Sequence, residues 1–399
     1  MTGPTLALEG IRVLDLSRVL AGPFCAMLLA DLGADVLKIE DTATGDESRT
    51  WPPHKDGESA AFLVINRNKR DMTLDLKQPE GVEILKTLVA RADVLIENFR
   101  TGTMESFGVG YDTLSTLNPR LVYCSISAFG RTGPRAEGAG YEALMQAFSG
   151  IMSITGEPDG PPVRCGISFL DLTTGIFSAF GIVSALAHRQ HTGLGQRVDA
   201  SLLETAVGLL SYHAEGYLLT GTVPTALGSS HPSVVPYRNF RCGDGQWVFI
   251  AAANDRLWQR LAPALGLAAL TGDPRFKSNP ERVKHRKDLE AALEAAIARH
   301  ERQTLLKMLE DAGVPATPVN TVDQVMNDPQ TAARGIIQRV VHARLGEIPL
   351  VGTPLKFSRM QPGVRTPAPS QGQHTDEILA EHGYGPDAIT TLRSKNVVR

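Results

Sequence analysis

The stretch LEGIRVLDLSRVLAGPFCAMLLADLGADVLKIE, residues 8–40, decides the fold. Residues 11–16 form a short, mostly apolar run that predicts a buried strand, and residues 21–29 predict an apolar helix that ends at Gly33. Residues 35–39 then predict a second strand. A strand, a helix and another strand in this order predict two parallel strands joined by a helical crossover.

The same alternation continues along the first half of the chain. Apolar runs predict further strands at 72–76, 94–96 and 121–126, and a helix that starts with a proline is expected at 79–91. This alternation predicts an α/β fold, with a Rossmann-like parallel sheet covered by helices. The pattern then changes to long apolar helices, expected at 172–189 and 201–219.

A second module follows a linker rich in Gly, Ser and Pro at 224–236. It starts with a hairpin-like stretch and continues with three helices, expected at 255–265, 288–300 and 303–312. We therefore expect a large domain at 1–222, a small α+β domain at 223–328, and a C-terminal segment at 329–399 that returns to the large domain. In that segment, strands that rejoin the first sheet are expected at 340–357 and a last helix at 375–381.

Composition excludes several classes of protein. The 399 residues hold 40 Lys and Arg against 43 Asp and Glu, which gives no basic surplus for nucleic acid. The four cysteines include no CxxC pair, so we expect neither disulfides nor a thiolate zinc site, and a cytoplasmic location fits best. The apolar run at 172–187 is shorter than the ~20 residues that cross a bilayer. We expect a buried core helix there and no membrane partner.

Other chemistry-bearing motifs are weak or missing. The chain has no Walker A sequence and no G-x-S-x-G elbow. Gly138, Gly140 and Ala143 resemble a dinucleotide motif but follow a loop instead of a strand, which argues against a tightly bound nucleotide cofactor. His188 and His191 lie near a predicted helix end, where histidines usually complement the helix dipole, so we expect no metal site.

Two features are ambiguous from the residues alone. The segment NRNKR, residues 66–70, suits a phosphate or 3′-phospho-ADP group, and it equally suits a solvated loop. Asp171 precedes a predicted helix in an apolar stretch. Its pattern favours a helix N-cap, and the alternative is a carboxylate nucleophile that attacks a carbonyl in an apolar pocket.

The ordered motifs resemble those of the class III coenzyme A transferases, the CaiB/BaiF family. The resemblance rests on 8–40, on NRNKRDMTLDL and ADVLIENF, on GYEALMQAFSGIMSITG with DLTTGIFSAFGIVSAL, and on the tail motifs PLKFSRM and GQHTDEIL. It implies an interlocked homodimer, with a Rossmann-like large domain built from both chain ends and a small inserted domain. It also implies a coenzyme A thioester as substrate, without a tightly bound cofactor.

The resemblance assigns Asp171 as the nucleophile that attacks an acyl-CoA thioester. An aspartyl acyl anhydride and then an aspartyl-CoA thioester follow, and backbone amides near the start of the helix at Asp171 are expected to receive the oxyanions. The residues that it implies for CoA and substrate binding are Val19, Leu20, Asn68, Lys69, Asn98, Phe99, Met104, Tyr141 and Glu142.

The resemblance also bears on the substrate. Formyl-CoA transferases of the family carry a glycine-run loop where this chain has GSSHPSVVPYRNF, residues 228–240. The chain is more similar to succinyl-CoA-dependent dicarboxylate transferases, and we expect a C4 to C6 dicarboxylate as acceptor. Arg164, His231 and Arg238 are candidates to hold its second carboxylate.

Two other functions stay open. The superfamily includes 2-methylacyl-CoA racemases, which carry a GHD-like sequence where this chain has Gly140, Tyr141 and Glu142. The missing histidine removes one acid/base partner and makes the racemase the weaker hypothesis. A non-catalytic CoA-binding protein is the other, and the intact block at Asp171 argues against it.

Overall fold

A computed structural model describes residues 6–399, which form two compact units. The large unit holds the chain up to Ser149 together with Cys165–Glu215 and Ala332–Arg399. The small unit holds Gly150–Arg164 and Gly216–Thr331. The division near Gly216 lies a few residues before the expected one, and the segment before Cys165 joins the small unit.

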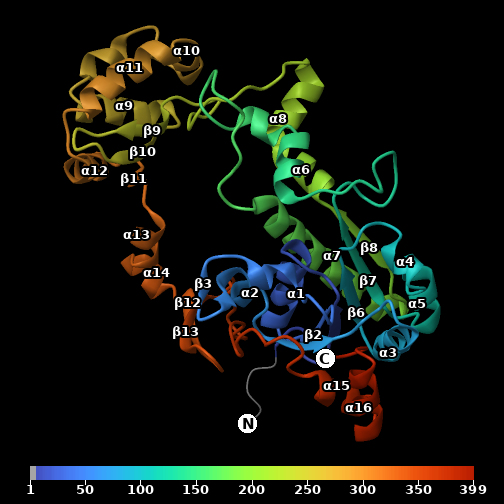
Figure 1. Ribbon diagram of the computed structural model, residues 1–399. Helices are drawn as coiled ribbons and strands as arrows, with labels where there is room; N and C mark the ends of the chain where they lie inside the picture. The colour runs from blue at the N-terminus through green and yellow to red at the C-terminus, as the bar shows by residue number, and fades with distance from the viewer. Residues whose placement is uncertain (1–5) are drawn as a thin grey trace. The chain divides into compact units, whose positions relative to one another are not determined.

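The large unit is built on a six-stranded parallel sheet in the order β5-β2-β1-β6-β7-β8 (Figure 1). Its strands are β1 (Arg12–Asp15), β2 (Asp35–Glu40), β5 (Lys69–Thr73), β6 (Val94–Glu97), β7 (Val122–Ser127) and β8 (Arg197–Ser201). The predicted parallel sheet is confirmed. β5 starts three residues earlier than expected, and β8, whose polar sequence RVDAS gave no strand signal, adds an edge strand.

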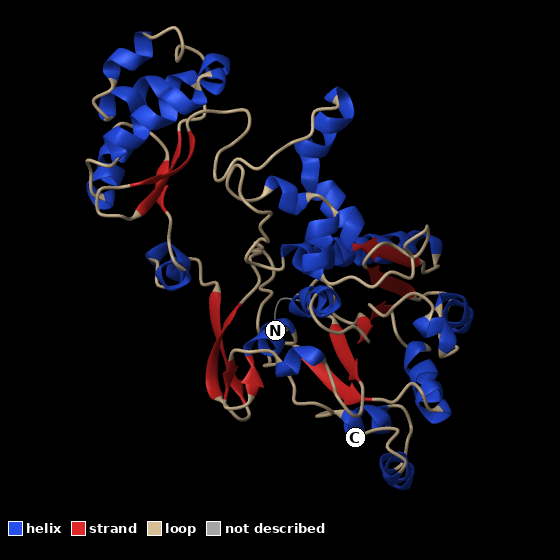
Figure 2. Cartoon of the chain, turned by 45° about the horizontal axis from the view of Figure 1, so that its top comes forward, coloured by secondary structure: helices blue, strands red, loops and turns tan. Residues whose placement is uncertain are grey.

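Side chains alternate between the two faces of the sheet along each strand, and on each face they pack with helices into an apolar layer. Val13 and Val94 face α1 (Ala21–Asp31) and α7 (Phe169–Thr192). Leu14 and Leu95 face the opposite layer, which is formed by α3 (Pro79–Val89), α5 (Tyr111–Leu117), α15 (Thr375–Glu381) and α16 (Pro386–Ser394). Figure 2 shows helices on either side of the red strands.

Helix α7 is longer than predicted. Its 24 residues are sufficient by length and composition to cross a membrane, which corrects the expectation that this run is too short. One side, with Thr174, Ser178 and Ile182, is buried against the large unit. The other side exposes apolar residues, and Phe180 is 71 % exposed. Within a single chain, therefore, only one side of α7 belongs to a buried core.

The small unit is an antiparallel sheet with a helical layer. Its strands are β9 (Tyr237–Arg241), β10 (Trp247–Ala251) and β11 (Ala316–Pro318), in the order β11-β10-β9. Its core lies between this sheet and helices α9 (Asp255–Ala264), α10 (Asn279–Lys284), α11 (Arg286–Ile297) and α12 (Arg302–Asp311). The predicted hairpin and three helices are confirmed.

The other elements lie outside the two main sheets and their helical layers or complete them. Strands β12 (Ile337–His342) and β13 (Gly346–Val351) pair only with each other, so the expectation that this stretch joins the main sheet is wrong. Helix α15, which was predicted as the last helix, lies where it was expected. Helix α16 follows it and was not predicted. The remaining short elements are η1 (Glu47–Thr50), β3 (His54–Lys55), β4 (Glu58–Ser59), α2 (Ala60–Ile65), α4 (Thr103–Ser106), α6 (Glu142–Phe148), η2 (Ile151–Ile154), η3 (Ala268–Gly272), α13 (Val322–Met326) and α14 (Pro329–Ala333). Helix α8 (Leu202–Thr220) contains a kink at Ser211, where φ is 45°.

Candidate active site

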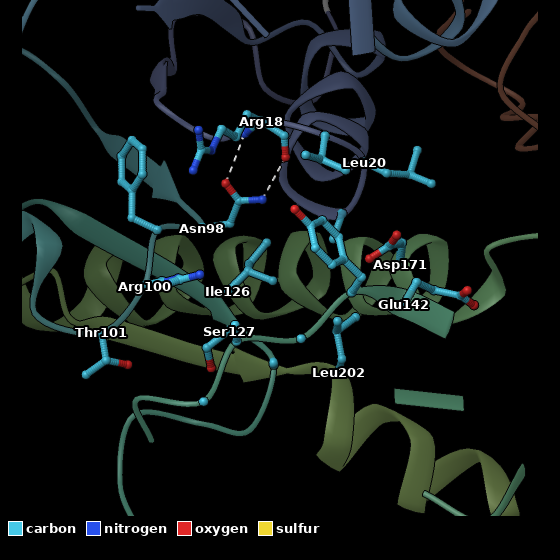
Figure 3. Close-up of a pocket in the computed structure, with 18 of the residues that line it drawn as sticks. Arg18, Leu20, Asn98, Arg100, Thr101, Ile126, Ser127, Glu142, Asp171 and Leu202 are labelled. Atoms are coloured by element: carbon cyan, nitrogen blue, oxygen red, sulfur yellow. Dashed lines mark hydrogen bonds between the residues drawn. The ribbon is translucent and has the colours of Figure 1, made fainter. Parts of the chain in front are cut away.

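A cavity of about 200 Å³ opens in the large unit beside the carboxyl ends of β1, β6 and β7 (Figure 3). Ligands of open α/β sheets bind at this edge because the loops that follow the strands meet there. The cavity is lined from three directions: by the turn after β1, by the segment after β6, and by the loop between β7 and α6. Asp171 closes it from the start of α7.

Asp171 is the carboxylate of this cavity. It is the third residue of α7, and the N-cap residue is Ser168, so the interpretation of Asp171 as the cap is wrong. Among residues 6–399, no group donates a hydrogen bond to its side chain. Burial and the nearby Glu142 carboxylate raise the pKa of Asp171 to about 7. A partly buried carboxyl without a donor is unusual, and such groups gather at functional sites.

Close packing of two helices sets the position of Asp171. Gly175 lies one turn further along α7, and a Cβ atom there would lie 2.7 Å from the carbonyl oxygen of Ala21. Because residues four apart share a helix face, the contact at Gly175 brings Asp171 toward the first turn of α1. Figure 3 shows Asp171 beside Leu20 on this side of the cavity.

Glu142 ties two helices together beside Asp171. It is the first residue of α6 and is 6 % exposed. Its Oε1 accepts hydrogen bonds from Gln146 Nε2 at 2.6 Å and from the backbone N–H of Leu170 at 3.4 Å. One carboxylate thus joins α6 to the start of α7. Tyr141, the N-cap of α6, is 65 % exposed and also lines the cavity.

The turn after β1 is held from two sides. Asn98 accepts from the Arg18 backbone N–H at 2.9 Å and donates to the Arg18 carbonyl at 2.7 Å, as the dashed lines in Figure 3 show. Val19 has a φ of 73°, a left-handed value that is rare for a β-branched residue. Four predicted substrate-binding residues line this part of the cavity, namely Val19, Leu20, Asn98 and Phe99.

Three other predicted CoA contacts lie elsewhere. The ammonium of Lys69 is buried and donates to Asp15, Pro23 and Asn66, so it has no hydrogen left for a phosphate. The Asn68 side chain bonds to Asp31 and to backbone groups at 363, 365 and 366. Met104 is 1 % exposed and packs in the core. The Asn68 and Lys69 side chains therefore serve the interior of this chain, in contrast to the phosphate prediction.

The predicted acceptor-binding residues belong to the small unit. Arg238 pairs with Glu290 at 2.8 Å and with Glu294 at 3.4 Å, so its guanidinium is already used. The His231 ring contacts the Tyr237 ring edge-on. Arg164 is an exposed residue of the same unit. Their role in binding an acceptor stays a prediction.

A second, larger cavity adjoins the first. It has about 500 Å³ and lies beside the ends of β1, β2 and β5. Arg18 and Phe99 line both cavities, and the Arg18 guanidinium lies 5.8 Å from the centre of the Phe99 ring. The sequence analysis missed Arg18 and Arg100. Arg100 directly follows the predicted pair Asn98 and Phe99, and this adjacency was the available signal.

Metal ligation finds no support in the part of the chain that the structure describes. Residues 6–399 contain no group of three His, Cys, Asp or Glu side chains that could hold an ion. His188 and His191 are exposed at the end of α7. The four cysteines are free thiols.

Comparisons with known proteins agree with this geometry. A succinate–glutarate CoA-transferase from Agrobacterium fabrum is 40% identical over 94% of this chain and 95% of its own length. A succinyl-CoA–D-citramalate CoA-transferase from Chloroflexus aurantiacus is 38% identical over 99% of both. The crystal structure of a CaiB/BaiF family protein from Brucella suis superposes with a TM-score of 0.84 at 41% identity, over 95% of this chain and 100% of that one. Residues 8–375 match the family model, and the chain belongs to CoA-transferase family III.

Proposed function

We propose that this enzyme transfers coenzyme A from succinyl-CoA to a dicarboxylate, with Asp171 as the nucleophile. The observation that carries the proposal is the Asp171 carboxyl itself, which lines the cavity without a hydrogen-bond donor from residues 6–399. Hydrogen bonds to the ionised form would weaken it as a nucleophile. A pKa of about 7 keeps a large ionised fraction near neutral pH together with high basicity.

The chemistry requires only acyl exchange. A carboxylate oxygen of Asp171 attacks the thioester carbon, the carbon–sulfur bond breaks, and CoA leaves as a thiolate with an aspartyl acyl anhydride behind it. The thiolate attacks the aspartyl carbon of that anhydride, which releases succinate and leaves an aspartyl-CoA thioester. An acceptor carboxylate then repeats both steps in reverse order. No net proton is consumed, and water must be kept from the anhydride.

The two adjoining cavities suit a long, bipartite substrate. The small cavity, of about 200 Å³, suits the acyl group at Asp171, and the larger one, of about 500 Å³, suits the nucleotide end. Arg18 lies where they meet, and Arg100 lines the small cavity without an ion-pair partner among residues 6–399. These guanidinium groups are the natural partners of the CoA phosphates, in place of Lys69.

The oxyanion of each tetrahedral step needs backbone donors. The start of α7 was expected to provide them, but the Leu170 N–H there already donates to Glu142. The first turn of α1 has no side-chain cap, and Leu20 and Ala21 line the same cavity as Asp171. We therefore favour the N–H groups of Ala21 and Gly22, since the first turn of a helix leaves such groups without intrahelical partners, whereas Pro23 has no N–H and the Phe24 N–H donates to the Leu20 carbonyl.

We also propose that the protein works as a homodimer. The large unit exposes apolar side chains along α6 and α7, among them Leu144, Phe148, Phe177 and Phe180. Exposed apolar surface of this kind marks a contact face. A second chain of the same fold explains the apolar side of α7 better than a lipid, because its other side is packed in a core. Sedimentation should give twice the mass of one chain, and Phe180→Asp should shift the measured mass toward that of the monomer.

A cytoplasmic location stays our proposal, in line with four free thiols.

One trapping experiment tests the reaction. The enzyme is mixed with succinyl-CoA and hydroxylamine, which converts an activated aspartyl ester into a stable hydroxamate that peptide mass spectrometry locates. A hydroxamate on Asp171 that needs succinyl-CoA supports the proposal, and Asp171→Asn is the control. An unlabelled Asp171 with succinyl-CoA and acetyl-CoA would overturn it. Deuterium exchange at the α-carbon of a 2-methylacyl-CoA would then indicate the racemase, and its absence a non-catalytic CoA-binding protein.

A further inference from the structure

The segment 66–70 has a role that the phosphate hypothesis did not foresee. Its one ammonium group, Lys69 Nζ, lies beneath the active-site turn and is fully enclosed. It donates to Asp15 at 2.8 Å, to the Pro23 carbonyl in the first turn of α1 at 2.9 Å, and to Asn66 at 2.8 Å. One cation therefore joins the end of β1 to the start of α1, across the turn that lines the cavity.

A second buried lysine holds the same turn. Lys38 Nζ donates to the Ser17 carbonyl at 3.0 Å and to Asp46 at 2.8 Å. Asp46 in turn accepts from the Val19 backbone N–H at 3.1 Å. The side chains of Lys38 and Asp46 are each 1 % exposed. Lys38 thus holds Ser17 directly, and through Asp46 it holds Val19, the residue with the left-handed backbone.

The turn itself resists this conformation. A β-branched side chain such as Val19 disfavours a φ of 73°, so surrounding contacts must hold it there. Ser17 also packs directly on Gly22, where a Cβ atom would meet the Ser17 Cβ at 2.2 Å. These contacts close the turn against α1 and determine where Leu20 and Ala21 lie relative to Asp171.

We infer that Lys38 and Lys69 are positioning residues of the transfer reaction, which hold the turn 17–20 so that the first turn of α1 faces Asp171. The inference rests on the proposed role of Asp171. Neither lysine lines the cavity at Asp171, and although Lys38 borders the larger adjoining cavity, its ammonium is bound to Ser17 and Asp46, so each lysine acts on Asp171 through the backbone that it holds. Misplacement of a reacting group by about 1 Å is able to cost about a hundredfold in rate.

The first test compares Lys69→Met with Arg70→Met. Arg70 is the next residue, but its partners Asp35, Glu377 and Glu381 lie away from the turn. We expect Lys69→Met to lower kcat by tenfold to a hundredfold per folded chain, with KM for succinyl-CoA changed less than threefold. Arg70→Met should keep kcat within twofold. Single-turnover trapping should still label Asp171 in nearly every Lys69→Met chain, only more slowly.

The second test uses the strained residue. Glycine adopts a positive φ freely, so Lys38→Met should cost at least fivefold less in kcat in a Val19→Gly background than in the wild type. This coupling also decides the question if Lys69→Met fails to fold. The inference is overturned if kcat per folded chain stays within twofold of wild type, if lost activity merely tracks a lost fraction of labelled chains, or if the coupling is absent. Failure of the proposed function looks different, because then wild-type enzyme forms no hydroxamate at all.

Discussion

Replacement of Asp171 by Asn should make the folded protein more stable while it abolishes transfer. The carboxyl has no hydrogen-bond donor within residues 6–399 and lies near a second carboxylate, so its ionised form is unfavourable in the folded state. Asn has nearly the same shape and carries no charge. The change therefore removes an electrostatic penalty without opening a cavity.

The size of the effect follows from the pKa of Asp171. That pKa is raised from 3.8 in the unfolded chain to about 7 in the folded protein. A raised carboxyl pKa means that the folded state binds the proton more tightly, so stability falls as pH rises from about 4 to about 7. The penalty on the wild type is at most about 2 kcal/mol at pH 5 and about 4 kcal/mol at pH 8, and solvent reaching the partly exposed carboxyl lowers both.

Thermal unfolding at the two pH values measures this difference. The advantage of Asp171→Asn over the wild type should grow by up to about 2.5 kcal/mol from pH 5 to pH 8, or about 3 °C in Tm for a chain of this length. Protein concentration is kept constant because subunit association also shifts Tm. Asp112→Asn, an exposed position in the first turn of α5, is the matched control and should show no such growth. An advantage that is equal at pH 5 and pH 8, or no advantage, refutes the reasoning.

Two further changes test the surroundings of Asp171, and a third tests a separate buried carboxyl. Gly175→Ala places a Cβ atom 2.7 Å from a backbone oxygen of α1 and should lower kcat at least tenfold in a steady-state assay. Gly181→Ala is the control, because its Cβ atom meets only the Val198 side chain, and its kcat should stay near wild type. Glu142→Gln removes the second cause of the raised Asp171 pKa, so the acid limb of the kcat profile should move to lower pH, and an unmoved limb contradicts this. Burial and the neighbouring Glu40 raise the pKa of Asp71, so the folded state is increasingly penalised as pH rises above the ordinary carboxyl range. The Tm advantage of Asp71→Asn over wild type should therefore increase with pH, and an advantage that does not change with pH contradicts this.

The sequence pointed to the sheet and to Asp171 for different reasons. The strands around residues 11–16 and 35–39 were readable because their apolar runs are buried on both faces. The polar β8 was not readable, since an edge strand needs only a partner and no apolar run. The 340–357 stretch alternates like a strand, but its pairing is local, and alternation alone does not name the partner.

The candidate site likewise combines features that the sequence reveals with features that depend on the fold. The motif around Asp171 was recognisable, but its surroundings depend on contacts between distant segments, such as Gly175 with Ala21. Lys69 illustrates the limit most clearly. A cation in a basic, polar segment looks the same in sequence whether it faces a phosphate or a buried aspartate. Only the parallel pairing of β5 with β2, next to β1, decides that it points inward to Asp15.

The distribution of charge around the cavity favours a strong nucleophile. A cation next to Asp171 would stabilise its ionised form, lower its pKa and reduce its basicity. Three cations around the turn have other partners: Lys69 pairs with Asp15, Lys38 with Asp46, and Arg18 lies 3.6 Å from Glu47. Arg100 also lines the cavity, but it does not lower the pKa of Asp171, which only burial and Glu142 shift. The fold thus places positive charge beneath and beside the turn while it leaves Asp171 facing a carboxylate. The same carboxyl that is unfavourable for stability is therefore the group best prepared to attack a thioester, because both properties have one cause, an anion that the surrounding chain does not neutralise.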